Sequence, residues 1–411
     1  MSGLNGTPRA NRVHIALFGK TNAGKSSIIN AVTGQELALV SDVKGTTTDP
    51  VYKSMELLPL GPVVLIDTAG LDDISELGEL RKKKTIEVLN KTDIALLIMD
   101  GTIGVTDYDV DILEQIKAKK VPVIVVLNKI DLTEITKNEI KELQKKLKCK
   151  VIATSANSKK GINELKEALA KSVPEEEDKF KIVGDLISPG DFVVLVTPID
   201  KAAPKGRLIL PQQQTIRDIL ESDAMAVVTK EFELRETLEN LGKKPKMVIT
   251  DSQAFLKVSA DTPKDILMTS FSILLARNKG DLPELVRGAK AIAKLKDGDK
   301  ILVSEGCTHH RQSDDIGSVK IPRWIRQITG KQIEFEYTSG MSFPENIDEY
   351  ALIVHCAGCM LNRTGMMHRI GQAEEIGVPI VNYGVLIAYV HGILDRALKP
   401  FPLARMVWEE E

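Results

Sequence analysis

The sequence is short of cysteine, of net charge and of long apolar runs, and each shortage excludes a class of protein. Four cysteines in 411 residues are too few for a disulfide scaffold and fit a reducing compartment. The 55 Lys and Arg residues nearly balance the 57 Asp and Glu residues, whereas domains that neutralise nucleic acid are usually strongly basic. The N-terminus lacks a signal-peptide core, and no apolar stretch reaches the ~18 residues that span a bilayer. We therefore expect a soluble, cytoplasmic protein with neither a membrane nor a nucleic acid as partner.

What the sequence does contain is ordinary globular composition arranged in three blocks. Through residue 172, short apolar runs alternate with helix-periodic segments, which predicts a doubly wound α/β domain that we place at 1–172. A proline and a run of charges then indicate a linker. Beyond it we expect a small α/β middle domain that serves dimerisation, the two together at 173–264, and a C-terminal α/β domain with a second parallel sheet at 265–411. In detail, we expect a strand at 207–210 and a helix at 267–277.

A glycine-rich segment in the first block has the pattern of a phosphate-binding loop. Residues 19–26 match G-x-x-x-x-G-K-[ST], after a strand-like apolar run and before a helical segment. The glycines allow backbone N–H groups to surround phosphate oxygens at the positive end of a helix. We expect Lys25 to reach the β- and γ-phosphates and Ser26 to bind Mg²⁺. The expected nucleotide contacts here are Gly19, Asn22, Ala23, Gly24, Lys25, Ser26 and Ser27.

Segments at the ends of later strands select guanine over adenine. In N-K-I-D at 128–131, Asp131 can accept from the two N–H donors that guanine has and adenine lacks, while the stem of Lys129 can cover the base. Backbone N–H groups of Ser155 and Ala156 can reach guanine O6. These segments lie where ligands bind in open α/β sheets, at the carboxyl ends of parallel strands. The predicted ligands are GTP and GDP, with Asn128, Lys129, Asp131, Ser155 and Ala156 as contacts.

Two further segments complete the expected magnesium and γ-phosphate site. Asp67 in D-T-A-G can hold Mg²⁺ through water, and Gly70 can offer its N–H to the γ-phosphate. In G-T-T-T-D at 45–49, we choose Thr47 to complete the Mg²⁺ shell and to sense the γ-phosphate, with its neighbours Thr46 and Thr48 as alternatives. The expected catalytic residues are Lys25, Thr47 and Gly70.

Together these segments resemble the translation-factor-like GTPases of the TrmE–Era–EngA group over about residues 12–172. The resemblance lies in N-A-G-K-S, G-T-T-T-D, D-T-A-G and N-K-I-D. It implies a K⁺ ion near Asn22 and slow, K⁺-stimulated hydrolysis, because Leu71 stands where Ras-like enzymes carry the glutamine that orients water. Thr48 departs from the arginine found in sequences of the T-T-R-D type.

Three of the four cysteines lie in the last block, near two histidines. They occur as Cys307-Thr-His309 and His355-Cys356-Ala-Gly-Cys359, and each group ends a predicted strand, so both can meet at one sheet edge. The chemistry leaves three interpretations open: a tetrahedral zinc site, a [4Fe–4S] cluster with one iron left to another ligand, or redox thiols. Glu305 is a further oxygen donor nearby. Cys149, in the first block, is expected to be a plain buried thiol.

The order of domains and the C-x-H…H-C-x-x-C pattern resemble the HydF family of [FeFe]-hydrogenase maturation GTPases over nearly the whole chain. The resemblance implies a [4Fe–4S] cluster held by Cys307, Cys356 and Cys359, with His309, His355 and Glu305 as candidates for the fourth ligand. It also implies a homodimeric scaffold or carrier for a di-iron subcluster precursor, with the hydrogenase apoprotein and radical-SAM maturation enzymes as partners. GTP hydrolysis would then gate release or partner exchange. The alternative is a ribosome- or tRNA-associated GTPase with a structural zinc domain.

Overall fold

The computed structural model describes residues 11–34, 50–68, 78–173, 181–198, 208–306, 315–340, 343–344 and 346–410. The chain divides into two compact units, Met1–Glu175 and Glu176–Glu411. All three α/β regions expected from the sequence are present, one in the first unit and two in the second. No helix within the described segments is long and apolar enough to cross a membrane.

The first unit is built on a six-stranded sheet in the order β2-β3-β1-β4-β5-β6. Its strands are β1 (Val13–Phe18), β2 (Val51–Leu57), β3 (Gly61–Asp67), β4 (Ile94–Asp100), β5 (Val123–Asn128) and β6 (Lys150–Ala153). Five were expected as buried apolar runs, and they pair in parallel. β2 was not expected, and it pairs antiparallel with β3. Its side chains are mostly half-buried or exposed, as befits an edge strand, so no continuous apolar run marks it in the sequence.

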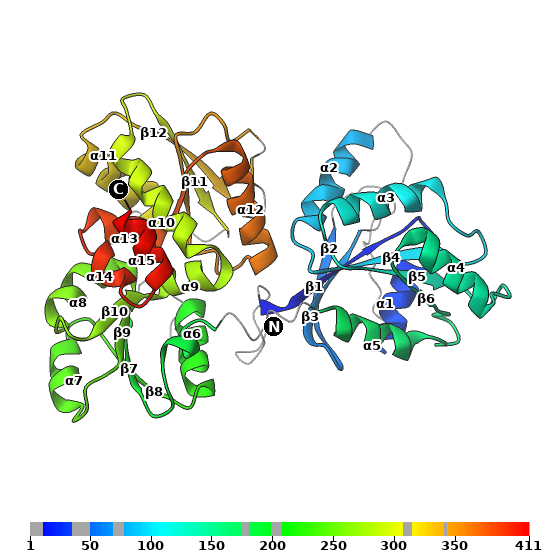
Figure 1. The fold of residues 1–411 in the computed structure, drawn as a ribbon, viewed down its shortest axis with the longest axis horizontal. Coiled ribbons are helices and arrows are strands. Elements are labelled where there is room, and N and C mark those ends of the chain that lie inside the picture. Colours follow the sequence, from blue (N-terminus) through cyan, green and yellow to red (C-terminus); the bar gives the residue numbers. More distant parts are fainter. Residues whose placement is uncertain are drawn as a thin grey trace. The chain divides into compact units, whose positions relative to one another are not determined.

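Five helices cover this sheet on both faces, as Figure 1 shows. They are α1 (Lys25–Thr33), α2 (Gly78–Leu89), α3 (Asp107–Ala118), α4 (Lys137–Leu147) and α5 (Ile162–Ser172). Side chains of α1 and α5 form a core with one face of the strands, and those of α2, α3 and α4 form a second core on the other. This doubly wound arrangement leaves the carboxyl ends of the parallel strands free to carry a site.

The second unit contains two four-stranded sheets whose strands are all parallel. The middle sheet has the order β10-β9-β7-β8 and the C-terminal sheet the order β12-β11-β13-β14. The strands are β7 (Phe192–Val196), β8 (Met225–Thr229), β9 (Met247–Thr250), β10 (Leu267–Ser270), β11 (Lys300–Glu305), β12 (Glu334–Ser339), β13 (Leu352–His355) and β14 (Ile380–Asn382).

A single hydrophobic core joins these two sheets. It runs from Ile182 to Ala404 and includes strands of both. Helix α9 (Phe271–Lys279) is part of the junction, because it packs against β10 of the middle sheet and β14 of the C-terminal sheet. The other helices are α6 (Leu210–Glu221), α7 (Leu234–Asn240), α8 (Phe255–Asp261), α10 (Leu282–Lys290), α11 (Ile321–Thr329), α12 (Arg363–Ile376), α13 (Tyr383–Val390), α14 (Leu394–Leu398) and α15 (Pro402–Glu409).

The structure corrects two local expectations. The strand expected at 207–210 is absent over its described residues, because α6 begins at Leu210 with a proline in its first turn, where the fixed φ of proline suits a helix. The helix expected at 267–277 is a buried strand, β10, followed by α9, whose first turn is capped by the hydroxyl of Ser270. The boundary proposed after residue 264 therefore separates β10 from the sheet to which it belongs.

Candidate functional site

The phosphate-binding loop joins β1 to α1 and has backbone angles that few residues other than glycine adopt. Gly19 has a φ of 141°, and a Cβ there would lie 2.2 Å from the carbonyl oxygen of Ile98. Gly24 has a φ of 95°, and a Cβ there would lie 2.3 Å from Nδ2 of Asn128. The two glycines of the motif are thus required by close approach to other strands, in addition to any contact with phosphate.

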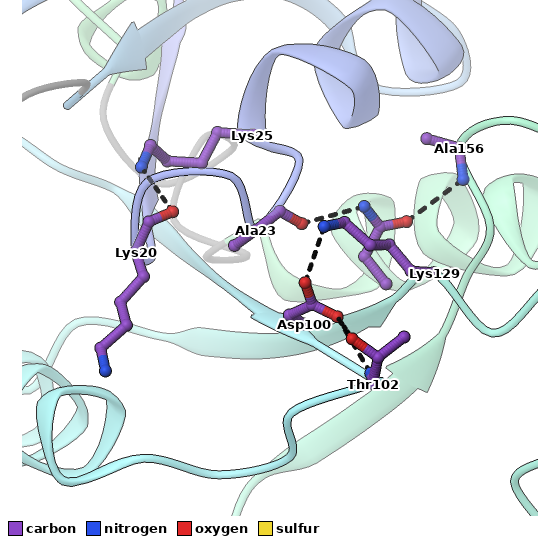
Figure 2. Close-up of polar contacts among 8 residues, drawn as sticks. Lys20, Ala23, Lys25, Asp100, Thr102, Lys129 and Ala156 are labelled. Atoms are coloured by element: carbon purple, nitrogen blue, oxygen red, sulfur yellow. Dashed lines mark hydrogen bonds and ion pairs between the residues drawn. The ribbon is translucent and has the colours of Figure 1, made fainter. Parts of the chain in front are cut away.

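Lys25, the first residue of α1, is folded back over this loop. Its Nζ donates hydrogen bonds to the carbonyl oxygens of Gly19, at 2.5 Å, and Lys20, at 3.1 Å, the second of which is drawn in Figure 2. The side chain is buried. By contrast, Asn22, Ser26 and Ser27 are exposed on the loop and on the first turn of the helix. The loop therefore presents a buried ammonium group and exposed polar side chains at the positive end of α1.

The end of β3 lies beside the start of this loop. Asp67 is buried and is in parallel register with Leu17 of β1. The next residue, Thr68, donates its hydroxyl hydrogen to the carbonyl oxygen of Leu17 at 2.5 Å. The structure thus brings Asp67 to the sheet edge where the sequence placed it. Thr47 and Gly70, the other expected Mg²⁺ and γ-phosphate residues, lie outside the described residues, as does Leu71.

Asn128, at the end of β5, braces the loops of the guanine side. Its Nδ2 donates to the carbonyl oxygen of Ala23 at 3.1 Å, and its Oδ1 accepts from the N–H of Ala156 at 3.2 Å, so it joins the phosphate loop to the segment after β6. The N–H of Ser155 donates to the carbonyl oxygen of Lys160. Both N–H groups that the sequence assigned to guanine O6 therefore make bonds within the protein in this structure.

Lys129 has a partner that sequence reasoning missed. Its Nζ donates to Oδ2 of Asp100 at 2.6 Å, and Asp100 also accepts from the backbone and hydroxyl of Thr102 (Figure 2). Burial acts to raise the pKa of Asp100, but these hydrogen bonds outweigh it and hold the pKa below its usual value. The signal in the sequence was an aspartate at the end of β4, level with Asn128 in the sheet.

Asp131 is an exposed carboxylate held by its neighbours. A hydrogen bond from the side chain of Ser155 is the largest cause that lowers its pKa, and its own backbone and Asn157 add to the effect. The group is therefore ionised near neutral pH and acts only as a hydrogen-bond acceptor. That is the chemistry needed to recognise two adjacent N–H donors.

The second candidate site lies in the other unit, at the carboxyl ends of β11 and β13. These strands are neighbours, with Ser304 level with His355, so the expectation that the two cysteine segments end at one sheet edge is confirmed for the strands. Glu305 and Gly306 then lie beside the loop that starts at Cys356. Cys307 and His309 lie outside the described residues.

The loop after β13 wraps its backbone around a buried sulfur atom. Sγ of Cys356 accepts hydrogen bonds from the N–H groups of Gly306, at 3.1 Å, and Gly358, at 3.3 Å. Burial raises the pKa of this thiol, and the two hydrogen bonds partly oppose the rise. Gly358 has a φ of 62°, and a Cβ there would lie 2.3 Å from the terminal methyl of Met366. This loop thus depends on its glycine as the phosphate loop does.

His355, a candidate fourth ligand, uses both ring nitrogens within the protein. Its Nδ1 lies 2.7 Å from the carbonyl oxygen of Cys356, and its Nε2 lies 2.8 Å from Nη1 of Arg369. Burial, followed by the charge of Arg369, lowers its pKa to about 3. The ring is therefore neutral, with the proton assigned to Nδ1 by this network. In this arrangement His355 orients the loop and has no nitrogen available for a metal.

Glu305 lies at the same edge as a buried carboxylate. Its Oε1 accepts a hydrogen bond from the hydroxyl of Tyr383 at 3.1 Å. Burial raises the pKa of Tyr383 well above its usual value, followed by the charge of Glu305, so the phenol keeps its proton and donates it to this bond. Glu305 is thus held beside the cysteine loop by a partner on α13 that sequence reasoning did not identify.

The donor set at this edge suits a sulfur-bound, negatively charged group. The described residues contribute two thiols, a sulfur atom that accepts backbone N–H bonds, and two buried cations, Lys279 and Arg369, whose pKa values burial lowers to about 8 and about 10. No three His, Cys, Asp or Glu side chains converge as a metal-binding group among them. The residues present therefore fit an iron–sulfur group only together with Cys307.

Comparison with known proteins assigns the second unit. Residues 182–280 match the hydrogen maturase F dimerization domain, and residues 283–400 match the hydrogen maturase F tetramerization domain. The chain belongs to the hydrogen maturase F family. Residues 14–129 match a further family described as 50S ribosome-binding GTPase, which agrees with the phosphate loop and the strand order of the first unit. The first unit is therefore a P-loop GTPase domain.

Curated relatives resemble the first unit alone. The tRNA modification GTPase MnmE of Desulforamulus reducens is 36% identical over 39% of this chain and 34% of its own length. GTPase Der of Wolinella succinogenes is 36% identical over 39% of this chain and 35% of its own length. The chain thus spans about a third of the length of these relatives. Among solved structures, Era of Aquifex aeolicus bound to GDP and aluminium fluoride is similar with 23% identity over 56% of this chain and 98% of its own, at a TM-score of 0.35 that carries no argument.

Proposed function

We propose that the protein is an [FeFe]-hydrogenase maturation factor that hydrolyses GTP and carries a di-iron subcluster precursor on a domain with a [4Fe–4S] cluster. The observation that carries this proposal is the joining, in one chain, of a P-loop GTPase domain to a strand-end cysteine loop inside two hydrogen maturase F domains. The ribosome- or tRNA-associated alternative draws support from relatives of the GTPase domain alone.

In the nucleotide site, each residue acts through a charge or a hydrogen bond already described. Lys25 places an ammonium group at the β- and γ-phosphates, where charge develops in the transition state. Ser26 and Asp67 hold Mg²⁺, and Asp131 accepts from guanine. Thr47 and Gly70 are proposed for the γ-phosphate side. A K⁺ ion at Asn22 would add positive charge near the phosphates, and a faster rate in K⁺ than in Na⁺ would support it.

In the cysteine site, Cys307, Cys356 and Cys359 are the proposed cluster ligands. A fourth cysteine is absent from this domain, so one iron takes a different ligand. The geometry favours Glu305 over His355, because the carboxylate lies beside the loop while both nitrogens of His355 are engaged. His309 remains a candidate outside the described residues.

The two sites lie in separate compact units, which supports a division of labour. GTP hydrolysis gates release of the precursor or exchange of partners and performs no chemistry on the cluster. The partners are the hydrogenase apoprotein and radical-SAM maturation enzymes, and the two family domains support self-association as a dimer or tetramer.

The test is anaerobic reconstitution of the full chain with iron and sulfide. Wild type is expected to bind four irons per chain, as a [4Fe–4S] cluster requires, and to show an EPR signal on reduction. Serine variants of Cys307, Cys356 and Cys359 are expected to lose most of that iron. Cys149→Ser is the matched control, because Cys149 is a half-buried thiol in the first unit whose pKa burial raises. A colourless protein with one tight zinc would contradict the proposal.

The gating step is tested separately with Lys25→Ala. This variant should keep its iron but mature hydrogenase apoprotein much more slowly than wild type in a defined maturation assay. Maturation at the wild-type rate would refute gating and leave the cluster assignment intact.

A further inference from the structure

A buried lysine from another helix holds the cysteine loop from below. Lys279, the last residue of α9, is 4% exposed. Its Nζ donates to the carbonyl oxygens of Gly358 at 3.3 Å, Cys359 at 3.1 Å and Leu361 at 3.0 Å. All three donors of the ammonium group are therefore directed at the segment that carries Cys359.

The loop side returns the contact. Arg363, in the first turn of α12 just after the loop, donates from Nη1 to the carbonyl oxygens of Asn278 at 3.0 Å and Gly280 at 3.2 Å. These two residues flank Lys279. The end of α9 and the cysteine loop are thus joined by reciprocal hydrogen bonds across residues about 80 positions apart in the sequence.

The charge of Lys279 is not matched by a carboxylate. Its hydrogen-bond acceptors are carbonyl oxygens, and within the described segments it forms no ion pair. Burying an ammonium group is costly unless it is compensated. Methionine would fill a similar space without that cost, which makes a purely space-filling role a poor explanation. The nearest groups able to carry negative charge are the thiols of Cys359 and Cys356, which raise the pKa of Lys279 against the lowering by burial.

We propose that Lys279 is a positioning residue for the iron–sulfur group held by Cys356 and Cys359, fixing the loop through its carbonyls and stabilising the reduced, more negative state with its buried charge. This inference rests on the proposed function. It concerns how the chain tunes the cluster and adds no ligand to it. Arg369 supplies the other buried cation, but it acts on the loop through His355.

The direction of the expected effect follows from Coulomb's law. Adding an electron to the cluster is favoured by a nearby positive charge, most strongly in a medium of low dielectric constant. Removing that charge with Lys279→Met should therefore lower the midpoint reduction potential. We expect the reduction equilibrium to change at least tenfold, which is about 59 mV for a one-electron couple.

The experiment is an EPR-monitored redox titration of reconstituted full-length protein. Lys279→Met removes the charge and the donors, Lys279→Gln keeps amide donors without charge, and Lys279→Arg keeps the charge. Arg396→Met is the matched control, because Arg396 is also a buried cation that donates to backbone carbonyls, but those belong to residues 259, 262 and 263. We expect lower potentials for the Met and Gln variants, and wild-type potentials for the Arg and control variants.

A second measurement covers the case in which the Met variant retains no cluster. In cluster-free protein, hydrogen exchange of the amides of residues 356–361 should be faster in Lys279→Met than in Lys279→Gln and wild type, with the rest of the C-terminal sheet unchanged.

The outcomes separate the two proposals. Wild-type potentials in both uncharged variants, or unchanged exchange in the loop, would overturn the role of Lys279 while the cluster assignment stands. A wild-type protein that binds no cluster would overturn both.

Discussion

Two loops of this chain are held by a lysine that donates to backbone carbonyls, yet the lysines come from different distances. Lys25 lies in the helix directly after the phosphate loop and reaches carbonyls six and five residues before it. Lys279 lies on α9 and reaches carbonyls 79 to 82 residues after it. The first site is therefore assembled by local sequence, and the second by the packing of a whole unit.

The difference teaches where each site is vulnerable. The phosphate loop depends on residues that follow one another, so its damage should appear first in catalysis. The cysteine loop depends on α9, α12 and β11, so its damage should appear first in the order of the loop and the properties of what it binds. The predictions below challenge this contrast, beginning with the largest effect.

Lys25→Ala should reduce GTP hydrolysis by roughly 10²-fold or more, because it removes a charge directed at the developing negative charge of the transition state. Phosphate release under single-turnover conditions measures the effect. Lys20→Ala is the control, since its exposed side chain points away from Lys25 in Figure 2 and only its carbonyl takes part. Equal losses in both variants would mean that the charge of the loop matters and the position of Lys25 does not.

Asp131→Asn should weaken GTP binding by about 10- to 100-fold, from the loss of charged hydrogen bonds worth about 1.5–3 kcal/mol. It should also improve binding of xanthosine triphosphate, whose 2-oxo group accepts where the 2-amino group of guanine donates. Fluorescent-nucleotide competition measures both. If GTP weakens while the xanthine nucleotide does not improve, Asp131 does not read this edge of the base.

The same residue predicts a flat pH profile. The pKa of Asp131 is lowered from 3.8, so the carboxylate is already ionised above that value and is lost only as pH falls through the lower folded value. GTP affinity should therefore not change through this group between about pH 5 and about pH 8. A titration of GTP affinity in that window that vanishes in Asp131→Asn would contradict the assignment.

Asn128→Ala should lower the stability of the nucleotide-free protein by about 1–3 kcal/mol, because it leaves the carbonyl of Ala23 and the N–H of Ala156 without their partner. Thermal unfolding of the first unit measures the loss. Asn138→Ala, an exposed change on α4, should have little effect. Equal melting of the two variants would show that the brace between loops carries no stability.

Gly358→Ala should have the smallest effect, about 1–2 kcal/mol, from a left-handed backbone and the displacement of a flexible methionine methyl group. Gly377→Ala is matched to it, with φ of 80° but open space around the new Cβ, and should cost about 1 kcal/mol. Chemical denaturation of the second unit compares them. A much larger cost at Gly358 would show the cysteine loop to be as rigid as the phosphate loop.

The contrast also explains what could be predicted from sequence. The buried strands and the phosphate loop follow from patterns within a few residues, and the structure confirms the five parallel strands of the first sheet and the adjacency of β11 and β13. The edge strand β2 has no apolar run, and Ser270 hides a strand-to-helix change inside an apolar stretch. These failures are local signals overridden by position in the fold.

The missed site residues fail for another reason. Asp100, Lys279 and Arg369 are ordinary charged residues in the sequence, and their partners are far away along the chain. No spacing rule connects Lys279 to Cys359, because the contact exists only after α9 has packed between two sheets. Conversely, His355 carries the spacing of a ligand, but its nitrogens are engaged by Arg369 and a backbone carbonyl.

The single core that joins the middle and C-terminal sheets has a consequence for cooperativity. Although two family domains meet near residue 281, their buried side chains form one continuous cluster, so neither can lose its packing without exposing the other. The second unit should therefore melt in one transition. A mutation that loosens the self-association region would draw on the same free energy of unfolding that keeps the cysteine loop in place.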